Sequence, residues 1–226
     1  MEHLAQSRLV SRFQESVVNW YRRSGRVFYW RTHVLNSWQW LVLEILLRKT
    51  KAEAVEKIYP SLIAKYSSPK IVLQVSNSEL ENDLRFLGLY RQRRKGLKLV
   101  AARIVNVHAG VVPSDPPSLT SLPSVGPYIS NAILCFCLGQ RRAVVDINVA
   151  RVLTRFGGMN VPKDANRKWL WELATEMLPH ENWKEYNYGL LDLGALFCKS
   201  QNPKCMLCCL RDICGSAKNH LISRPS

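Results

Sequence analysis

Apolar residues recur along most of the chain with the three- and four-residue spacing of an amphipathic helix. Three segments carry this pattern clearly, at 38–46, 129–136 and 145–156, and each is predicted to be a helix. Short clusters of Pro, Ser and Asn are predicted to break the chain between helices. They lie at 36–37, 67–69, 113–117 and 162. No stretch alternates apolar and polar residues convincingly as a half-buried strand does, so the predicted fold class is all-α.

Glu44 interrupts the first of these helices in an unusual way. In WQWLVLEILL (38–47), Trp40, Leu43 and Leu47 add a second apolar face to the first, and a helix that is apolar all round is expected to be buried. An unpaired carboxylate is costly to bury, and burial favours the protonated form of the group. A carboxyl group poised in this way can donate a proton or activate water. We therefore interpret Glu44 as functional rather than structural.

The charge of the chain indicates a polyanionic partner. Lys and Arg number 32 against 17 Asp and Glu, a formal net charge of +15 over 226 residues. Such an excess is typical of nucleic-acid binding, whereas a merely soluble surface mixes both signs. No apolar run approaches the length of about 20 residues that spans a membrane, and the N-terminus lacks the apolar core of a signal peptide. We therefore expect no membrane partner and a reducing compartment.

Cysteines are crowded near the C-terminus in the spacing C-x6-C-x2-C-x5-C. The four residues are Cys198, Cys205, Cys208 and Cys214. In a reducing compartment such crowding indicates metal or cofactor ligands rather than disulfides. The spacing alone leaves zinc and an iron–sulfur cluster open, although zinc sites more often pair two short knuckles. Lys199 and Lys204 on the same loop are predicted to contact phosphates.

The stretch SLPSVGPYISNAI (121–133) predicts a tight turn that leads into a helix. Gly126 can adopt backbone angles closed to other residues, and Pro127 suits the first helical position. The N–H groups of Gly126, Tyr128 and Ile129 then lack helical partners, and the helix dipole favours an anion beside them. In a protein of this charge we interpret that anion as a DNA phosphate. An ordinary helix start is the alternative that the local sequence favours equally.

Five blocks of the sequence together resemble one protein family. They are EILLRKTKAEAV (44–55), FLGLYRQRRKGLKLVA (86–101), LPSVGPYISNAI (122–133), VDINVARVLTRFGG (145–158) and LLDLGALFC (190–198), which runs into the four cysteines. In this order they resemble the helix–hairpin–helix DNA glycosylases of the endonuclease III and adenine glycosylase superfamily, over most of the chain. The resemblance departs at Ser124, where family hairpins usually carry a glycine, which bears on the hairpin's backbone angles and on any cation bound there.

The resemblance implies a fold, a cofactor and a partner. The fold is a two-lobed, all-α helix–hairpin–helix glycosylase fold, with one lobe at 32–140 and the second built from 1–31 and 141–226. Base chemistry is implied in the cleft between the lobes, and a [4Fe-4S] cluster on the four clustered cysteines of the second. The partner implied is double-stranded DNA with a mismatched or damaged base. We expect a monomer that acts inside a prokaryotic cell, in the cytoplasm or nucleoid.

Three residues match catalytic positions of the family. Asp146, in the motif Asp-x-Asn-Val, matches the aspartate that stabilises the oxocarbenium-like sugar; a helix N-cap is its alternative role. Glu44 lies where the adenine and mismatch-thymine branches carry a glutamate. Tyr128 stands where the endonuclease III branch carries a lysine that forms a Schiff base. The resemblance therefore implies base removal without amine-driven strand cleavage; packing at a helix start is the alternative for Tyr128.

Further DNA contacts are predicted around these positions. Arg48 lies where relatives insert a polar side chain into the space left by the flipped base, and Arg suits the acceptors of an orphaned guanine. A solvated charge at a helix end is the alternative. The remaining residues assigned to the interface are Lys49, Ser124, Gly126, Tyr128, Asn148, Lys199 and Lys204. The basic run RQRRKGLK (91–98) is predicted to form a phosphate-facing stripe, with a solvated helix face as the alternative.

The leading functional hypothesis is a monofunctional glycosylase of base excision repair that flips and hydrolytically removes thymine, and also uracil, mispaired with guanine. Tyr128 together with EILLRKT resembles the archaeal-type thymine glycosylase branch. Adenine glycosylases usually continue into a further domain, whereas this chain ends about a dozen residues after Cys214. An adenine or other damaged-base glycosylase is the next alternative. A non-catalytic DNA-binding or redox-sensing iron–sulfur protein is a third, and Glu44 and Asp146 argue against it.

Overall fold

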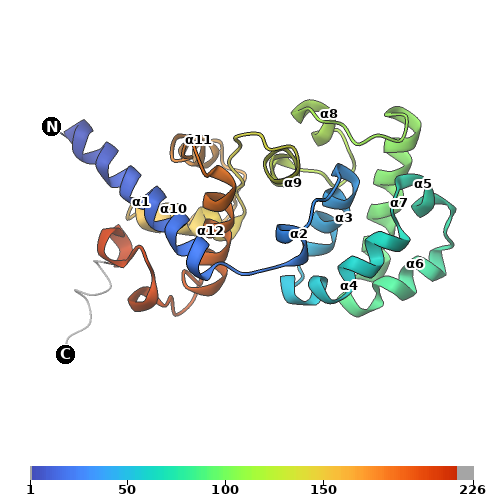
Figure 1. Ribbon diagram of the computed structural model, residues 1–226, viewed down its shortest axis with the longest axis horizontal. Coiled ribbons are helices and arrows are strands. Elements are labelled where there is room, and N and C mark those ends of the chain that lie inside the picture. The colour runs from blue at the N-terminus through green and yellow to red at the C-terminus, as the bar shows by residue number, and fades with distance from the viewer. Residues whose placement is uncertain (1, 218–226) are drawn as a thin grey trace. The chain divides into compact units, whose positions relative to one another are not determined.

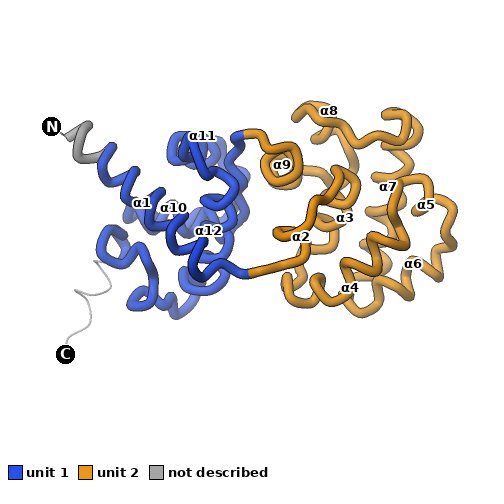
Figure 2. Tube along the Cα trace, viewed as in Figure 1, with its two compact units in different colours: residues 1–26, 141–226 blue, residues 27–140 orange. Residues whose placement is uncertain are grey.

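Figure 1 shows the computed structural model of the protein, which describes residues 2–217, with side chains from residue 7 onward. The regular elements of this part of the chain are all helices, so the predicted all-α class is confirmed. No helix within it is long and apolar enough to span a membrane. The chain divides into two compact units, 1–26 with 141–226 and 27–140 (Figure 2). The sequence-based division places the first boundary at residue 32 instead.

In the unit formed by 1–26 and 141–226, the central helix is α12. Its helices are α1 (Glu2–Ser24), α10 (Ile147–Phe156), α11 (Lys168–Glu176) and α12 (Trp183–Leu196), followed by the short 3-10 turns η3 (Cys205–Leu207) and η4 (Arg211–Ile213). α12 packs against both α1 and α10. Two glycines permit this approach, because a Cβ on Gly189 would lie 2.7 Å from Val17 Cγ1 and one on Gly194 would lie 2.7 Å from Asn148 Cβ.

A buried ion pair ties the end of the N-terminal segment to α12. The carboxylate of Asp192 is fully buried. It accepts hydrogen bonds from the backbone N–H of Arg26 at 2.8 Å and from its Nε at 2.7 Å. A carboxylate that has lost its water needs such a partner, since an uncompensated buried charge is strongly destabilising. The pair therefore anchors the chain to this unit at the point where the unit 27–140 begins.

In the unit 27–140, helices pack around α3 and α7. The elements are α2 (Tyr29–Thr32), α3 (Ser37–Leu47), α4 (Ala52–Lys65), α5 (Pro69–Gln74), α6 (Asn77–Leu84), η1 (Arg85–Leu87), α7 (Tyr90–Val107), α8 (Pro116–Thr120), α9 (Pro127–Ala132) and η2 (Ile133–Cys137). α3 packs against α4, α7 and η2, while α7 also covers α5 and α6. α3 is therefore enclosed by its neighbours, which explains why it is apolar on more than one face.

Three of the breaks predicted from the sequence are helix starts. Asn36 and Gln39 form a reciprocal capping box ahead of α3. Ser68 caps α5 and Asp115 caps α8, each side-chain oxygen accepting from a backbone N–H group three residues on. Those N–H groups have no partner within the helix, so the caps fix where each helix begins.

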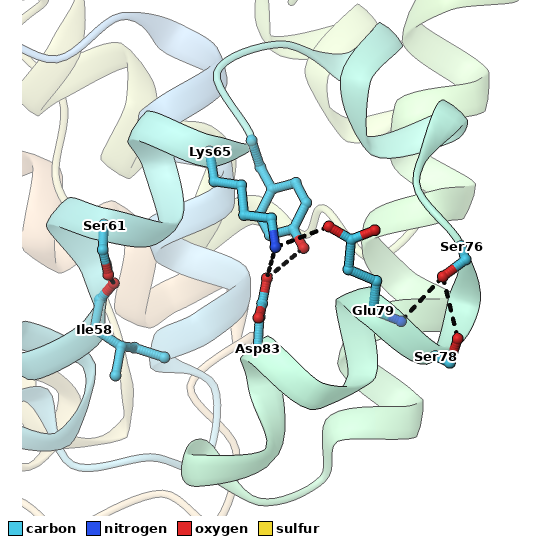
Figure 3. A network of polar contacts seen from close by, with 8 residues as sticks. Ile58, Ser61, Lys65, Ser76, Ser78, Glu79 and Asp83 are labelled. Carbon is cyan, nitrogen blue, oxygen red and sulfur yellow. Dashed lines mark hydrogen bonds and ion pairs between the residues drawn. The ribbon is translucent and has the colours of Figure 1, made fainter.

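An ion-pair network joins α4 to α6 (Figure 3). Lys65 Nζ lies 2.8 Å from Glu79 Oε1 and 2.7 Å from Asp83 Oδ2. The hydroxyl of Tyr66 donates to the same Asp83 oxygen at 2.6 Å, and Ser76 caps α6 by accepting from Glu79 N at 3.1 Å. The charged groups are partly exposed, so we assign the network mainly to the joining of two helices rather than to a large gain in stability.

The helices predicted from periodicity agree with the structure at two of three places. α3 includes the predicted 38–46, and α10 begins directly after Asp146. The predicted 129–136 begins as α9 but widens into the π-helical turn η2, in which Leu138 N donates to Ile133 O at 3.0 Å. The spacing of apolar residues does not separate an α-helix from a single π turn, because one extra residue per turn shifts the pattern only slightly.

Candidate active site

Asp146 lies at the N-terminus of α10, where its carboxylate is held by three hydrogen bonds. Oδ1 accepts from the backbone N–H groups of Asn148 (2.9 Å) and Val149 (2.7 Å), and Oδ2 accepts from Asn148 Nδ2 at 2.7 Å. The helix N-cap considered for this residue is therefore confirmed. These three donors hold the half-buried carboxylate in one orientation. Its catalytic role stays a prediction.

Arg151 connects Asn148 to the segment that carries the first clustered cysteine. Its guanidinium is buried, and Nη2 donates to Asn148 Oδ1 at 2.8 Å and to Gly194 O at 2.9 Å. Nε donates to the backbone oxygen of Cys198. A continuous chain of hydrogen bonds therefore runs from the Asp146 carboxylate through Asn148 and Arg151 to the end of α12, all within one unit.

The four clustered cysteines line a single cavity. Cys198, Cys205, Cys208 and Cys214 share its wall with apolar groups, among them Leu193 and Leu210. Arg155 donates to Cys198 Sγ at 3.6 Å and to Lys199 O at 2.7 Å, which holds the start of the loop. Within residues 2–217, no three His, Cys, Asp or Glu side chains are placed to hold one metal ion.

Glu44 lies on α3 with only 3% of its surface exposed, so its predicted burial is confirmed. Trp40, one turn earlier, stacks on Phe136 with ring centroids 5.6 Å apart. Burial raises the pKa of the nearby Tyr59, and the charges of Tyr29 and Glu44 raise it further. The Tyr59 hydroxyl therefore stays protonated and donates to Gln39 O at 2.8 Å on the same helix.

In the hairpin before α9, Gly126 does not adopt the special backbone angles that were expected of it. Gly126 has φ −99° and ψ −176°, an extended conformation open to any residue. The left-handed residue of this turn is Ser124, at φ +67°. The turn therefore forms although a serine replaces the family's usual glycine, and the strain lies at Ser124 rather than at Gly126. Pro127 is the first residue of α9, as predicted, and Tyr128 follows it, half-buried.

Arg48 and Lys49 lie in the short loop between α3 and α4, and both are exposed. Lys49 has φ +54°, a left-handed conformation that is uncommon for a residue with a side chain. Together with Ser124 they line a cavity that opens to solvent. Its other lining residues are Ile45, Leu89, Gln92, Arg93 and Gly96. The structure thus brings three of the predicted DNA-contacting residues around one basic cavity in the unit 27–140.

The basic run 91–98 is not the continuous phosphate-facing stripe that its composition predicts. Arg93 is buried, Arg94 Nε pairs with Glu81 at 2.7 Å, and Lys98 Nζ donates to the backbone oxygen of Leu73 at 3.1 Å. These three cations serve contacts inside the unit. Only Arg91 and Lys95 of the run's cations are exposed, so the predicted stripe shrinks to two side chains one helical turn apart.

The predicted site residues divide between the two units. Glu44, Arg48, Lys49, Ser124, Gly126 and Tyr128 belong to 27–140, and Asp146, Asn148, Lys199, Lys204 and the clustered cysteines belong to the other unit. Sequence reasoning missed Arg151 and Arg155. Their spacing from Asn148, three and seven residues along α10, is the signal that could have found them, because such residues share one helix face.

The helices of residues 2–217, the capped Asp146 and the cysteine-lined cavity fit a DNA repair protein, and the sequence comparison shows its family. The chain belongs to the HhH-GPD superfamily of base excision DNA repair proteins, whose family model matches residues 42–175. Its enzyme class, DNA glycosylase, is the one predicted from the sequence, and that prediction is confirmed.

Individual members of the family are similar to this chain over most of its length. The chain is 36% identical over 204 residues to the thymine/uracil-DNA glycosylase of Methanothermobacter thermautotrophicus, covering 90% of this chain and 92% of that protein. It is 35% identical over 201 residues to an adenine DNA glycosylase of Mycobacterium tuberculosis, covering 85% of this chain and 64% of that protein. The solved structure of a thermostable thymine-DNA glycosylase superposes with a TM-score of 0.89 at 32% identity, over 95% of this chain and 99% of that one.

Proposed function

We propose that this protein is a monofunctional DNA glycosylase that removes thymine, and also uracil, mispaired with guanine. The observation that carries the proposal is the similarity to a thymine/uracil-DNA glycosylase over about nine-tenths of both chains. A tyrosine at position 128 supports the monofunctional character. A phenol cannot form the Schiff base through which a lysine would cleave the strand.

The reaction is a hydrolysis in which water adds to C1′ of the deoxyribose as the bond from C1′ to the base breaks. The sugar carries positive charge in the transition state, and a fixed carboxylate stabilises it. We assign this role to Asp146, because three hydrogen bonds hold its carboxylate in one orientation. We assign to the buried Glu44 the proton transfer, either from the attacking water or to the departing base. Tyr128 shapes the base pocket in this scheme.

DNA is held by basic groups and by the hairpin in this proposal. Arg48 fills the space left by the flipped base, and its guanidinium suits the O6 and N7 acceptors of the orphaned guanine. Lys49 and Ser124, which line the same cavity as Arg48, together with Gly126, contact the backbone. Asn148, Lys199 and Lys204 contact the DNA from the other unit. All of these residues are at least partly exposed.

The cysteine-lined cavity fits a [4Fe-4S] cluster. Four thiolates are a donor set that holds such a cluster, and these four thiols line one cavity. We propose Cys198, Cys205, Cys208 and Cys214 as the ligands. When bound, such a cluster supplies a rigid, redox-active crosslink. Arg155, which donates to Cys198 Sγ, would partly neutralise the thiolate charge. Free thiolate ligands of this kind favour a reducing, intracellular setting.

The test is excision from end-labelled duplexes that carry T:G, U:G, A:G, A:8-oxoguanine or thymine glycol. We expect strand breaks from T:G and U:G only after hot alkali, because a hydrolytic enzyme leaves an intact abasic strand. Asp146→Asn serves as the inactive control that keeps the helix cap, since Asn caps as well as Asp. Excision by Asp146→Asn, breaks without alkali, or trapping of the protein on DNA with borohydride would overturn the mechanism.

An adenine glycosylase is the second candidate, favoured by the 35% identity to the mycobacterial enzyme. The two candidates differ in which base they remove. Release of adenine from A:G or A:8-oxoguanine without release of thymine from T:G would replace the proposed substrate and leave the assignments of Asp146 and Glu44 standing.

A further inference from the structure

Arg93 is a buried arginine, and four of its five hydrogen bonds go to the end of α3 and the loop that follows it. It lies near the start of α7 with 4% of its surface exposed. Nη1 donates to Ile45 O and Leu46 O, both at 2.9 Å, and Nη2 donates to Arg48 O at 3.0 Å and to Thr50 Oγ1. Nε donates to Gly88 O at 3.0 Å. A guanidinium has five N–H donors, so every one of them is used.

These contacts complete the C-terminal end of α3. The last carbonyl groups of a helix have no partner within it, and Arg93 supplies donors for the oxygens of Ile45 and Leu46 at this end. A cation is also favoured there by the helix dipole. The loop that follows carries the left-handed Lys49, a conformation that persists only where surrounding contacts hold it. Nη1 of Arg93 binds carbonyl groups before the helix end, and Nη2 binds Arg48 and Thr50, the residues on either side of Lys49.

The positive charges of Arg93 and Arg48 lie near each other in space. Burial, and then repulsion from Arg48, lower the pKa of the Arg93 guanidinium, although an arginine stays protonated at neutral pH. Its neighbour Arg94 behaves differently, because its Nε pairs with Glu81 on α6. Two adjacent arginines on one helix therefore have separate tasks, and only Arg93 reaches the 48–50 loop.

We propose that Arg93 is a positioning residue for base excision, which holds the 48–50 loop in the conformation that presents Arg48 and Lys49 to DNA. The inference rests on the proposed function for the role of those two side chains. It assigns to Arg93 no contact with DNA. Its effect on excision passes through the loop, because its donors are all engaged by the protein itself.

The variants are Arg93→Met, which keeps the length of the side chain and removes all donors, and Arg93→Lys, which keeps the charge but not the fork. Arg94→Met is the matched control, since it removes the same charge from the same helix. Each is assayed on T:G duplexes under single-turnover conditions, well below its own unfolding midpoint. We expect Arg93→Met to slow excision by about tenfold or more, because misplaced groups lose rate steeply. Arg93→Lys should fall between Arg93→Met and the wild type, and Arg94→Met should match the wild type.

A second comparison separates positioning from a general loss of structure. In a background of Arg48→Ala with Lys49→Ala, the loop lacks the two side chains assigned to DNA, so adding Arg93→Met should cause no further loss of excision or of duplex affinity. Losses that multiply in this background would show that Arg93 acts elsewhere and would overturn the inference. If Arg93→Met does not fold, the same cycle is run with Arg93→Lys.

Limited trypsin digestion reports on the loop without any DNA. We expect faster cleavage after Arg48, Lys49 and Lys51 in Arg93→Met than in the wild type or Arg94→Met, because opening of the loop exposes these bonds. Unchanged cleavage in Arg93→Met would overturn the inference. A wild type that excises no thymine, with faster cleavage in Arg93→Met, would refute the proposed substrate and leave the hold on the loop standing.

Discussion

Gly194 offers a sharp test of how the structure supports Asp146. The residue lies on α12 against the first turn of α10. A Cβ added there would lie 2.7 Å from Asn148 Cβ and 3.0 Å from both Asn148 C and Asn148 O. Two of these three atoms are backbone, so no flexible side chain can move aside. Asn148 provides two of the three donors to the Asp146 carboxylate, and Gly194→Ala should therefore displace that carboxylate.

The expected magnitudes differ for stability and for catalysis. Relief of the contact needs a shift of roughly 1 Å, since carbon atoms pack at about 3.5–4.0 Å. Overpacking of this kind costs about 1–3 kcal/mol, and the better helix propensity of Ala returns about 0.5–1 kcal/mol. The net loss of about 0–2.5 kcal/mol corresponds to at most about 10 °C in Tm for a chain of this size. A 1 Å displacement at a reacting group costs about 100-fold in rate.

Gly189→Ala is the matched control for this prediction. Its Cβ would lie 2.7 Å from Val17 Cγ1 and 3.1 Å from Val17 O, a comparable clash on the same helix but against α1. We expect both variants to lose similar stability by calorimetry, and only Gly194→Ala to lose single-turnover excision of thymine. Wild-type excision by a folded Gly194→Ala, or equal loss in both variants, would refute the idea that Asn148 carries the effect to Asp146.

Two further predictions concern the cysteines and the ion-pair network. Protein purified without oxygen should show broad brown visible absorbance that is lost in Cys205→Ser but kept in Cys209→Ser, since Cys209 is the spare thiol; equal loss in both would contradict the assigned ligands. Burial would raise the pKa of the Asp83 carboxyl, but hydrogen bonds from Lys65 and Tyr66 lower it below its ordinary 3.8. Its stabilising effect is therefore present at neutral pH and is lost only as pH falls below 3.8 through the folded-state pKa. The free energies of unfolding of wild type and Asp83→Asn should differ at pH 7 and approach each other as the pH falls below 3.8; a constant difference would contradict this.

Features set by short-range interactions could be predicted from the sequence alone. The period of apolar residues identified α3 and α10, because a helix buries one side every three to four residues. It also identified Glu44 as buried, since Trp40, Leu43 and Leu47 leave that helix no polar face. Asp146 could be predicted as a helix cap because capping joins a side chain to N–H groups only two or three residues away.

Other features depended on segments far apart in the sequence. The sequence of a basic run does not show which of its residues faces a neighbouring helix. Arg93 was therefore predicted to lie on the surface, whereas in the structure it donates to carbonyl groups more than 40 residues earlier in the chain. The partnership of Arg151 with Gly194 and Cys198 likewise spans more than 40 residues. The sequence determined which residues could be buried, capped or clustered, through local periodicity and spacing. Only the tertiary structure decided which buried cation meets which backbone oxygen, because that choice follows from how helices pack.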